Sequence, residues 1–229
     1  MSPNPIYVAL DTPDLDAALA LAAAAAPHVG GLKLGKEFLA ANGPEALARF
    51  KRFGLPLFAD TKFHDIPNTV AGAVRATARL GVHIVNVHAA GGEAMMKAAR
   101  DAAREVDANT KVIAVTVLTS MSDADLVAVG QATPARDQVL RLAALTRACG
   151  LDGVVCSAHE IAPIRAELGD DFLLVVPGIR PAGSALGDQT RVMGPREARD
   201  AGASILVIGR PITGVSDPAQ AARAIVESL

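Results

Sequence analysis

The chain has 229 residues, a formal net charge of −2, 51% hydrophobic residues and only 3% aromatic residues. The near-neutral charge and the few aromatic rings argue against a nucleic-acid partner, because such proteins use basic surfaces and rings that stack on bases. The longest apolar run, residues 17–27, is shorter than the roughly 20 residues that cross a bilayer, and no basic stretch typical of a signal peptide precedes it. We therefore expect a cytoplasmic protein with neither nucleic-acid nor membrane partners.

Short apolar, β-branched runs alternate with longer helical patterns along the whole chain. Proline near several helix starts and glycine near several helix ends support this division. The predicted strands are residues 6–10, 31–35, 55–61, 84–89, 111–119, 153–157, 172–177 and 204–211. The predicted helices are residues 14–26, 44–53, 68–80, 92–105, 135–149, 160–168, 195–201 and 217–228.

The predicted strands are continuous apolar runs, such as LLVV and ILVI, which is typical of a parallel sheet covered by helices on its faces. Eight βα units in about 230 residues favour a closed (β/α)8 TIM barrel over an open doubly wound sheet. No proline-rich or serine-rich linker divides the sequence, so we expect one domain over residues 1–229. The glycine-containing gap at residues 177–194 is a candidate lid over a ligand.

Charged residues lie on predicted strands where a barrel would carry its active site, at the carboxyl ends. Asp60 and Lys62 are two positions apart and therefore share a face of the third strand. Lys33 lies inside another apolar strand, where an unpaired charge would be costly. We expect Lys33, Asp60 and Lys62 to pair with one another and to have shifted pKa values. Other polar residues near predicted strand ends are Asp11, Asn86, His88, Thr119 and Ser120.

Asp65 follows Lys62 by three residues and has two interpretations. Either Asp65 or Asn68 caps the next helix, or Asp65 belongs to the charged group. The nearby carboxylate and lysine favour the second interpretation, whereas His64 is equally well explained as a packed or solvated neighbour.

The last two strands are followed by candidate phosphate ligands. Gly178 and Arg180 follow the seventh strand, and Gly209 and Arg210 follow the eighth, where barrels commonly hold phosphate. Residues 30–36 match the spacing of a P-loop, but they lack its Ser or Thr and have the pattern of a strand. The two cysteines have no metal-ligand spacing. We therefore expect no nucleotide cofactor and no metal.

Residues 60–69, DTKFHDIPNT, resemble the D-x-K-x-x-D-I-P-N-T signature of the orotidine 5'-phosphate decarboxylase family. Further similar segments occur in family order over nearly the whole chain, at residues 10–11, 32–35, 87–89, 118–120, 177–181, 188–189 and 208–211. Only Ala59 and Thr61, which adjoin Asp60 and Lys62 in the sequence, are smaller than the family pattern suggests. The resemblance implies a homodimeric, cofactor-independent carboxy-lyase. It would convert orotidine 5'-phosphate to uridine 5'-phosphate (UMP) and CO₂ in the last step of UMP biosynthesis.

The same resemblance implies roles for individual residues. Lys62 would protonate C6 of the pyrimidine within a charged array completed by Lys33, Asp60 and Asp65. Asp65, Ile66 and Thr69 would enter the site of the neighbouring subunit. The remaining implied contacts are Asp11 and Lys33 with the ribose, Thr119 and Ser120 with the pyrimidine edge, Gln189 with base and phosphate, and Arg180, Gly209 and Arg210 with the phosphate region.

Two alternatives stay open at this point. A magnesium-dependent sugar-phosphate decarboxylase or aldolase of the same superfamily shares the D-x-K-x-x-D core. The I-P-N-T continuation and Gln189 argue against it, and Glu37 is the only carboxylate near the second predicted strand. A non-catalytic phosphate-binding barrel, regulatory or structural, would be expected to lack part of the charged array, yet all four members are present.

Overall fold

The computed structural model describes residues 4–181 and 193–229, and its described strands form one closed parallel barrel in chain order. The predicted (β/α)8 architecture is confirmed, and pairing of the first strand with the last closes the ring. The strands are β1 (Ile6–Ala9), β2 (Gly31–Leu34), β3 (Leu57–Phe63), β4 (Ile84–His88), β5 (Lys111–Val115), β6 (Gly153–Val155), β7 (Leu173–Val176) and β8 (Ile205–Ile208).

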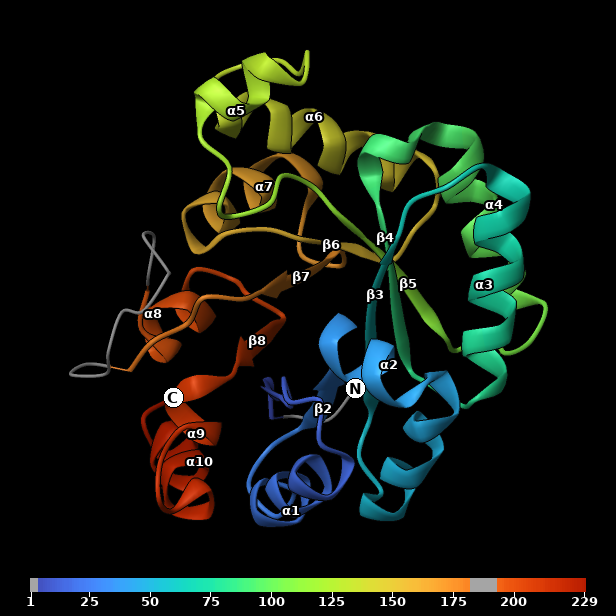
Figure 1. Cartoon of the computed structure of the whole chain (residues 1–229). Coiled ribbons are helices and arrows are strands. Elements are labelled where there is room, and N and C mark those ends of the chain that lie inside the picture. The colour runs from blue at the N-terminus through green and yellow to red at the C-terminus, as the bar shows by residue number, and fades with distance from the viewer. Residues whose placement is uncertain (1–3, 182–192) are drawn as a thin grey trace.

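Helices surround the strands on the outside, as Figure 1 shows. Those that the sequence predicts are α1 (Leu15–Ala25), α3 (Pro67–Arg79), α4 (Gly92–Arg104), α6 (Ala135–Ala148), α7 (Ile161–Leu168), α8 (Pro195–Asp200) and α10 (Pro218–Glu227). The predicted helix at residues 44–53 is the 3-10 helix η1 (Pro44–Phe53). Elements not predicted are α2 (Lys36–Asn42), α5 (Asp123–Ala128), α9 (Arg210–Thr213), and the 3-10 turns η2 (Ala89–Gly91) and η3 (Ala158–Glu160).

The strands divide the apolar side chains between two cores. Alternate residues point inward and fill the barrel, whereas those between them pack under the helices, as period-two geometry requires. On β7, for example, Val175 belongs to the inner core and Leu174 and Val176 to the outer one. The inner core consists of Tyr7, Ala9, Phe58, Ile84, Ile113, Val175, Ile205 and Val207, with Val155 packed against it.

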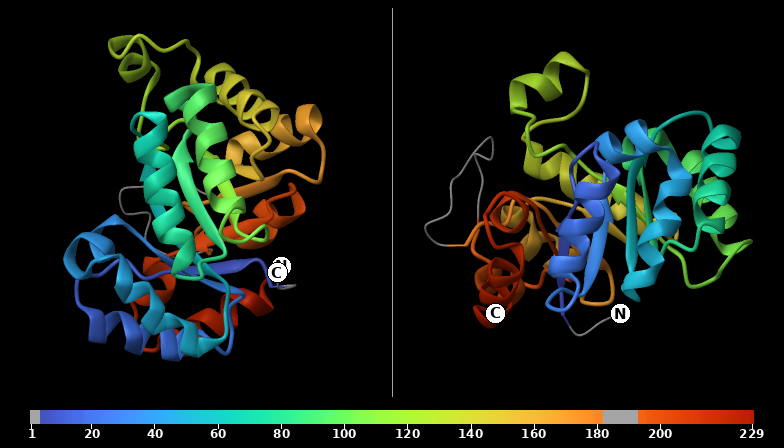
Figure 2. Two further views of the ribbon diagram at one scale, coloured as in Figure 1. Left: turned by 90° about the vertical axis from the view of Figure 1, so that its right-hand side faces the viewer. Right: turned by 60° about the horizontal axis from the view of Figure 1, so that its bottom comes forward.

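Alanine lets the outer helices lie close to the barrel. Asp14 caps α1 by accepting hydrogen bonds from two backbone amides of its first turn, and the buried face of the helix is mostly alanine. Figure 2 shows the helices around the strands from two further directions, with α5 standing off at one end of the molecule. Among the described residues, no helix is long and apolar enough to span a membrane.

The fifth and eighth predicted strands are too long. The apolar pattern continues to Leu118, but β5 ends at Val115 and the chain turns away toward α5. A capping box begins that helix, since Asp125 N–H donates to Ser122 Oγ and Ser122 N–H donates to Asp125 Oδ2. Thr119 therefore lies in a turn beyond the strand. In the same way β8 ends at Ile208, and Arg210 opens α9.

Candidate active site

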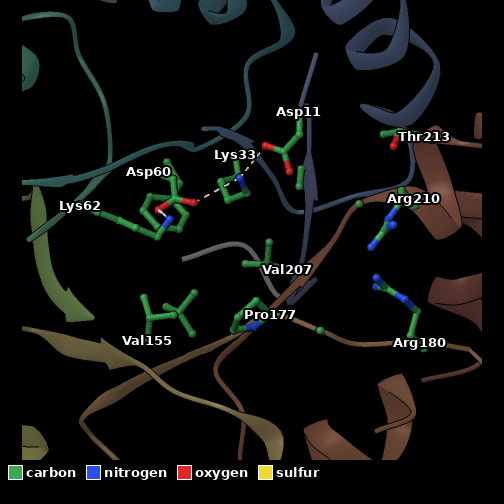
Figure 3. A pocket seen from close by; sticks show the side chains of 15 residues that line it. Asp11, Lys33, Asp60, Lys62, Val155, Pro177, Arg180, Val207, Arg210 and Thr213 are labelled. Carbon is green, nitrogen blue, oxygen red and sulfur yellow. Dashed lines mark hydrogen bonds and ion pairs between the residues drawn. The ribbon is translucent and has the colours of Figure 1, made fainter. Parts of the chain in front are cut away.

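A cavity of about 430 Å³ opens at the carboxyl ends of the strands, where a barrel places its chemistry. Figure 3 shows that its acidic and lysine side chains lie on one side and two arginines on the other, with apolar residues of the inner core between them. The lining residues are Ala9, Asp11, Lys33, Phe58, Asp60, Lys62, Val155, Val175, Pro177, Gly178, Arg180, Val207, Gly209, Arg210 and Thr213.

Four charged side chains alternate in sign along one wall of the cavity. Lys33 Nζ lies 2.9 Å from Asp11 Oδ1 and 3.2 Å from Asp60 Oδ2. Lys62 Nζ contacts the other oxygen of Asp60. The predicted ion pairs among Lys33, Asp60 and Lys62 are therefore present, and Asp11 extends the row. Lys33 and Asp60 are both buried, so the pair between them is poorly screened by water.

Neighbouring charges favour the ionised forms of Asp60 and Lys33. Burial alone would raise the pKa of Asp60, but Lys33 and Lys62, with hydrogen bonds from Lys62 and Asn86, lower it to about 2. Burial alone would lower the pKa of Lys33, but Asp60 and Asp11 outweigh that effect and raise it. The site therefore keeps the carboxylate of Asp60 and the ammonium of Lys33 charged over the physiological pH range.

The local backbone around Lys62 is irregular. Lys62 has a φ of 51°, the one positive value among the described residues other than glycine, and the register between β3 and β4 shifts between Ala59 and Phe63. Asn86 on β4 spans this irregularity. Its Oδ1 accepts a hydrogen bond of 2.7 Å from Lys62 N–H, and its Nδ2 donates one of 2.7 Å to Asp60 Oδ1.

Gly35, which follows β2, permits the close approach of Asp11 and Lys33. A Cβ atom at this position would lie 2.8 Å from Asp11 Oδ1 and 3.1 Å from Lys33 Nζ. Any larger residue would therefore push the aspartate away from its lysine. The glycine explains why two strands can bring these charges together beside the cavity.

The opposite wall of the cavity carries an anion-binding arrangement. Arg180, which is buried, and Arg210, which is exposed, extend toward each other in Figure 3. Gly178, with a φ of 78°, and Gly209 line the same wall. Guanidinium groups and accessible backbone amides are the usual ligands of phosphate. Thr213 also lines this wall, and only its position one turn after Arg210 on α9 could have indicated it.

Several predicted site residues do not reach the cavity within this chain. Asp65, Ile66 and Thr69 are exposed on the segment that leads into α3 and at its start, and Asp65 accepts a hydrogen bond of 2.7 Å from Ile66 N–H. Asp65 therefore does not join the array within a single chain, because β3 has ended before it. Thr119 and Ser120 also lie outside the set of lining residues. Gln189 lies outside the described residues, as does most of the candidate lid.

Asn86 is the site residue that the sequence pattern undervalued. Its side chain is fully buried in the barrel, and it touches two members of the array without lining the cavity itself. The signal available was an amide inside the apolar strand IVNVH. Such an amide must find hydrogen-bond partners, but a strand pattern alone does not say which.

Two histidines lie near the lysines. The rings of His64 and His88 stack with centroids 5.5 Å apart. Burial, together with electrostatic interactions with His64, Lys36 and Lys62, lowers the pKa of His88 to about 4. His88 is therefore neutral at physiological pH. Within the described ranges, no three or more His, Cys, Asp or Glu residues are grouped as they would be to hold a metal ion.

The barrel and its cavity define a candidate enzyme site, with lysines on one wall and arginines on the other that suit an anionic small molecule. The sequence profile of the "Orotidine 5'-phosphate decarboxylase / HUMPS family" matches residues 4–225, and the chain belongs to this family. It is 59% identical to the orotidine 5'-phosphate decarboxylase of Rhodospirillum rubrum, over 100% of this chain and 95% of the relative. It is 55% identical to that of Novosphingobium aromaticivorans, over 99% of each chain.

A solved structure agrees with these sequence comparisons. The crystal structure of orotidine 5'-phosphate decarboxylase from Lactobacillus acidophilus superposes with a TM-score of 0.87 at 36% identity, covering 98% of each chain. The structural comparison and the sequence comparisons therefore agree on the family.

Proposed function

We propose that this chain is an orotidine 5'-phosphate decarboxylase, which forms UMP and CO₂ in the last step of UMP biosynthesis. The observation that carries the proposal is that the row Asp11, Lys33, Asp60 and Lys62 faces Arg180 and Arg210 across one cavity. The family and the near relatives supply the identity of the substrate. A cytoplasmic location is the corresponding expectation for an enzyme of nucleotide synthesis.

Substrate binding follows from the two walls of the cavity. The phosphate would lie against Arg180, Arg210 and the glycine backbone, because guanidinium groups can bind phosphate through two hydrogen bonds. The ribose hydroxyls would then meet Asp11 and Lys33. The pyrimidine would place its carboxylate-bearing carbon, C6, next to Lys62. Binding energy from the phosphate, far from the breaking bond, would hold the base in this position.

The reaction breaks the bond between C6 and the carboxylate carbon. The electron pair stays on C6, and the carboxylate leaves as CO₂. The ammonium of Lys62 stabilises the charge that develops on C6 and then transfers a proton to it, forming the C6–H bond of UMP. Lys62 regains its proton from solvent. Asp60 pairs with the ammonium of Lys62 and fixes its direction beforehand.

The active unit in this proposal is a homodimer. Ile66 is 66% exposed, although it is a large apolar residue next to the site, and Asp65 and Thr69 are exposed beside it. A second copy of the chain would cover Ile66 and receive Asp65 and Thr69 in its own cavity. Thr119 and Ser120, which follow β5, would contact the base, and Gln189 would bridge the base and the phosphate. No metal or cofactor takes part.

The test is the loss of orotidine 5'-phosphate absorbance with purified protein, followed with and without EDTA. We expect turnover that EDTA leaves unchanged, and UMP as the only nucleotide product. Absence of turnover would contradict the proposal. Turnover abolished by EDTA and restored by magnesium would instead support the metal-dependent alternative.

A further inference from the structure

We propose that Asn86 is a positioning residue for the decarboxylation, because its amide fixes the carboxylate of Asp60 and the backbone of Lys62 in one arrangement. The inference rests on the proposed function, since it explains how Lys62 is aimed at C6. It assigns a role to a residue that does not line the cavity and that substrate does not reach.

The amide of Asn86 connects two residues of the array. Asn86 is 0% exposed, and both ends of its side chain are used. Its Nδ2 lies 2.7 Å from Asp60 Oδ1, and its Oδ1 lies 2.7 Å from the amide nitrogen of Lys62. The carboxylate can only accept and the N–H can only donate, so these partners determine the orientation of the amide. One side chain thus connects two residues of the array.

The backbone of Lys62 has an unusual conformation. A lysine with a φ of 51° is in the left-handed region, which non-glycine residues adopt only where the surroundings hold them there. The hydrogen bond from Lys62 N–H to Asn86 Oδ1 supplies such a restraint at the position where β3 and β4 shift register. Without it, the N–H loses its acceptor and the strand can relax toward an extended conformation. That change would re-aim the lysine side chain.

The amide of Asn86 also contacts the carboxylate of Asp60. Asp60 Oδ1 receives both Lys62 Nζ and Asn86 Nδ2, while Asp60 Oδ2 faces Lys33 at 3.2 Å. The amide therefore favours the rotamer in which each oxygen serves one lysine. Because Asn86 is neutral, it restrains the carboxylate without adding a charge that would attract or repel either ammonium group.

The chain offers a matched control one residue away. Thr61 Oγ1 donates a hydrogen bond of 3.0 Å to the backbone carbonyl of Asn86. This bond also connects β3 to β4, but it involves neither the amide of Asn86 nor the array. Thr61→Val therefore removes a link between the same strands and leaves the proposed function of the amide intact.

The experiment measures kcat and KM for orotidine 5'-phosphate and the dissociation constant for UMP. For Asn86→Ala we expect kcat to fall by about 100-fold, as misplacement of a reacting group by about 1 Å would cause. KM and UMP affinity should stay within about threefold, because Asn86 does not contact the ligand. Thr61→Val should keep kcat within about threefold of the wild type. Equal loss of UMP binding and activity in Asn86→Ala would indicate a merely structural role and overturn the inference.

Asn86→Asp changes the contact with Asp60 but keeps an acceptor for Lys62 N–H. It therefore tests the role of the amide even if Asn86→Ala does not fold. It keeps an oxygen for Lys62 N–H but places a second carboxylate against Asp60, within reach of Lys33, Lys62 and His88. Two such carboxylates share a proton. At low pH the shared proton can form the hydrogen bond that Asn86 Nδ2 donates in the wild type. This proton is lost as pH rises from about 5.5 to 8, so the kcat of Asn86→Asp relative to that of the wild type should fall over this range.

A pH-independent kcat ratio for Asn86→Asp, or kcat within threefold of the wild type in both variants, would overturn the inference. The wild type separates this failure from that of the proposed function. An active wild type with fully active variants removes only the role of Asn86. An inactive wild type removes both proposals.

Discussion

The ammonium of Lys62 contacts the carboxylate of Asp60, its neighbour two residues earlier on β3. Lys33 reaches the other oxygen of the same carboxylate from β2. Burying such charges costs desolvation energy that their attraction only partly offsets, so ion pairs of this kind are weak evidence for stability. We therefore interpret the array as a catalytic arrangement whose members depend strongly on one another.

Removing the central carboxylate should destabilise the fold. Asp60→Asn leaves Lys62 without its carboxylate and Lys33 with only the exposed Asp11, so we expect the free energy of unfolding to fall by about 3 kcal/mol. Urea unfolding at pH 7 measures this. Glu105→Gln, which breaks the exposed pair with Arg75 at 2.6 Å, is the control and should cost less than about 1 kcal/mol. Equal stability of the two variants would contradict the prediction.

Arg210 should act through the phosphate alone. We expect Arg210→Ala to lower kcat/KM for orotidine 5'-phosphate by about 10–100-fold, the value of a hydrogen bond between charged groups. The same substitution should change the slow turnover of orotidine, which lacks the phosphate, by less than about threefold. Arg49→Ala on the exposed surface of η1 is the control. An equal effect of Arg210→Ala on both substrates would show that the arginine does not bind the phosphate.

A shared active site predicts complementation between two inactive variants. In a mixed dimer of Asp60→Asn and Asp65→Asn chains, one site carries both substitutions and the other carries neither. Random mixing should therefore restore about a quarter of the wild-type activity, since half the dimers are mixed and half their sites are intact. Activity measured after joint refolding tests this, with each variant refolded alone as the control. No recovery in dimers shown to have mixed would contradict a shared site.

The neutral state of His88 makes stability depend on pH. Its pKa is lowered to about 4 in the folded protein, so below its ordinary value of 6.5 the unfolded chain binds a proton that the folded chain does not. The free energy of unfolding should therefore fall as pH drops from 6.5 to 4. His88→Gln should make this fall shallower, as measured by urea midpoints at several pH values. Parallel curves for the variant and the wild type would contradict the assignment.

The fold was predictable because the pattern of the strands is strong. Runs such as ILVI and LLVV are apolar on both faces, and the structure buries one set of residues in the barrel and the other under the helices. The helices that the pattern missed are short. Helix α2 has 7 residues and a single buried one, Phe38, so no helical period can develop. At the end of β5, local capping by Ser122 and Asp125 overrides an apolar run that continues past Val115.

The site was predictable in part for a different reason. A lysine inside an apolar strand requires a partner of opposite charge, and Lys33 pairs with Asp60 as this requirement predicted, and also with Asp11. The link from Asn86 to Lys62 was not predictable, because it depends on a left-handed residue and a register shift between strands. Spacing alone placed Asp65 with the array, whereas the end of β3 directs it to the exposed surface of the chain.

The central claim is that Lys62 supplies the charge and the proton for decarboxylation. Its most direct test follows the absorbance of orotidine 5'-phosphate with the wild type and with Lys62→Ala, alongside titration of both proteins with UMP. We predict that the variant loses at least about 10⁴-fold in kcat, because it lacks both the fixed cation and the proton donor, and still binds UMP measurably. A Lys62→Ala variant with wild-type kcat would contradict the account.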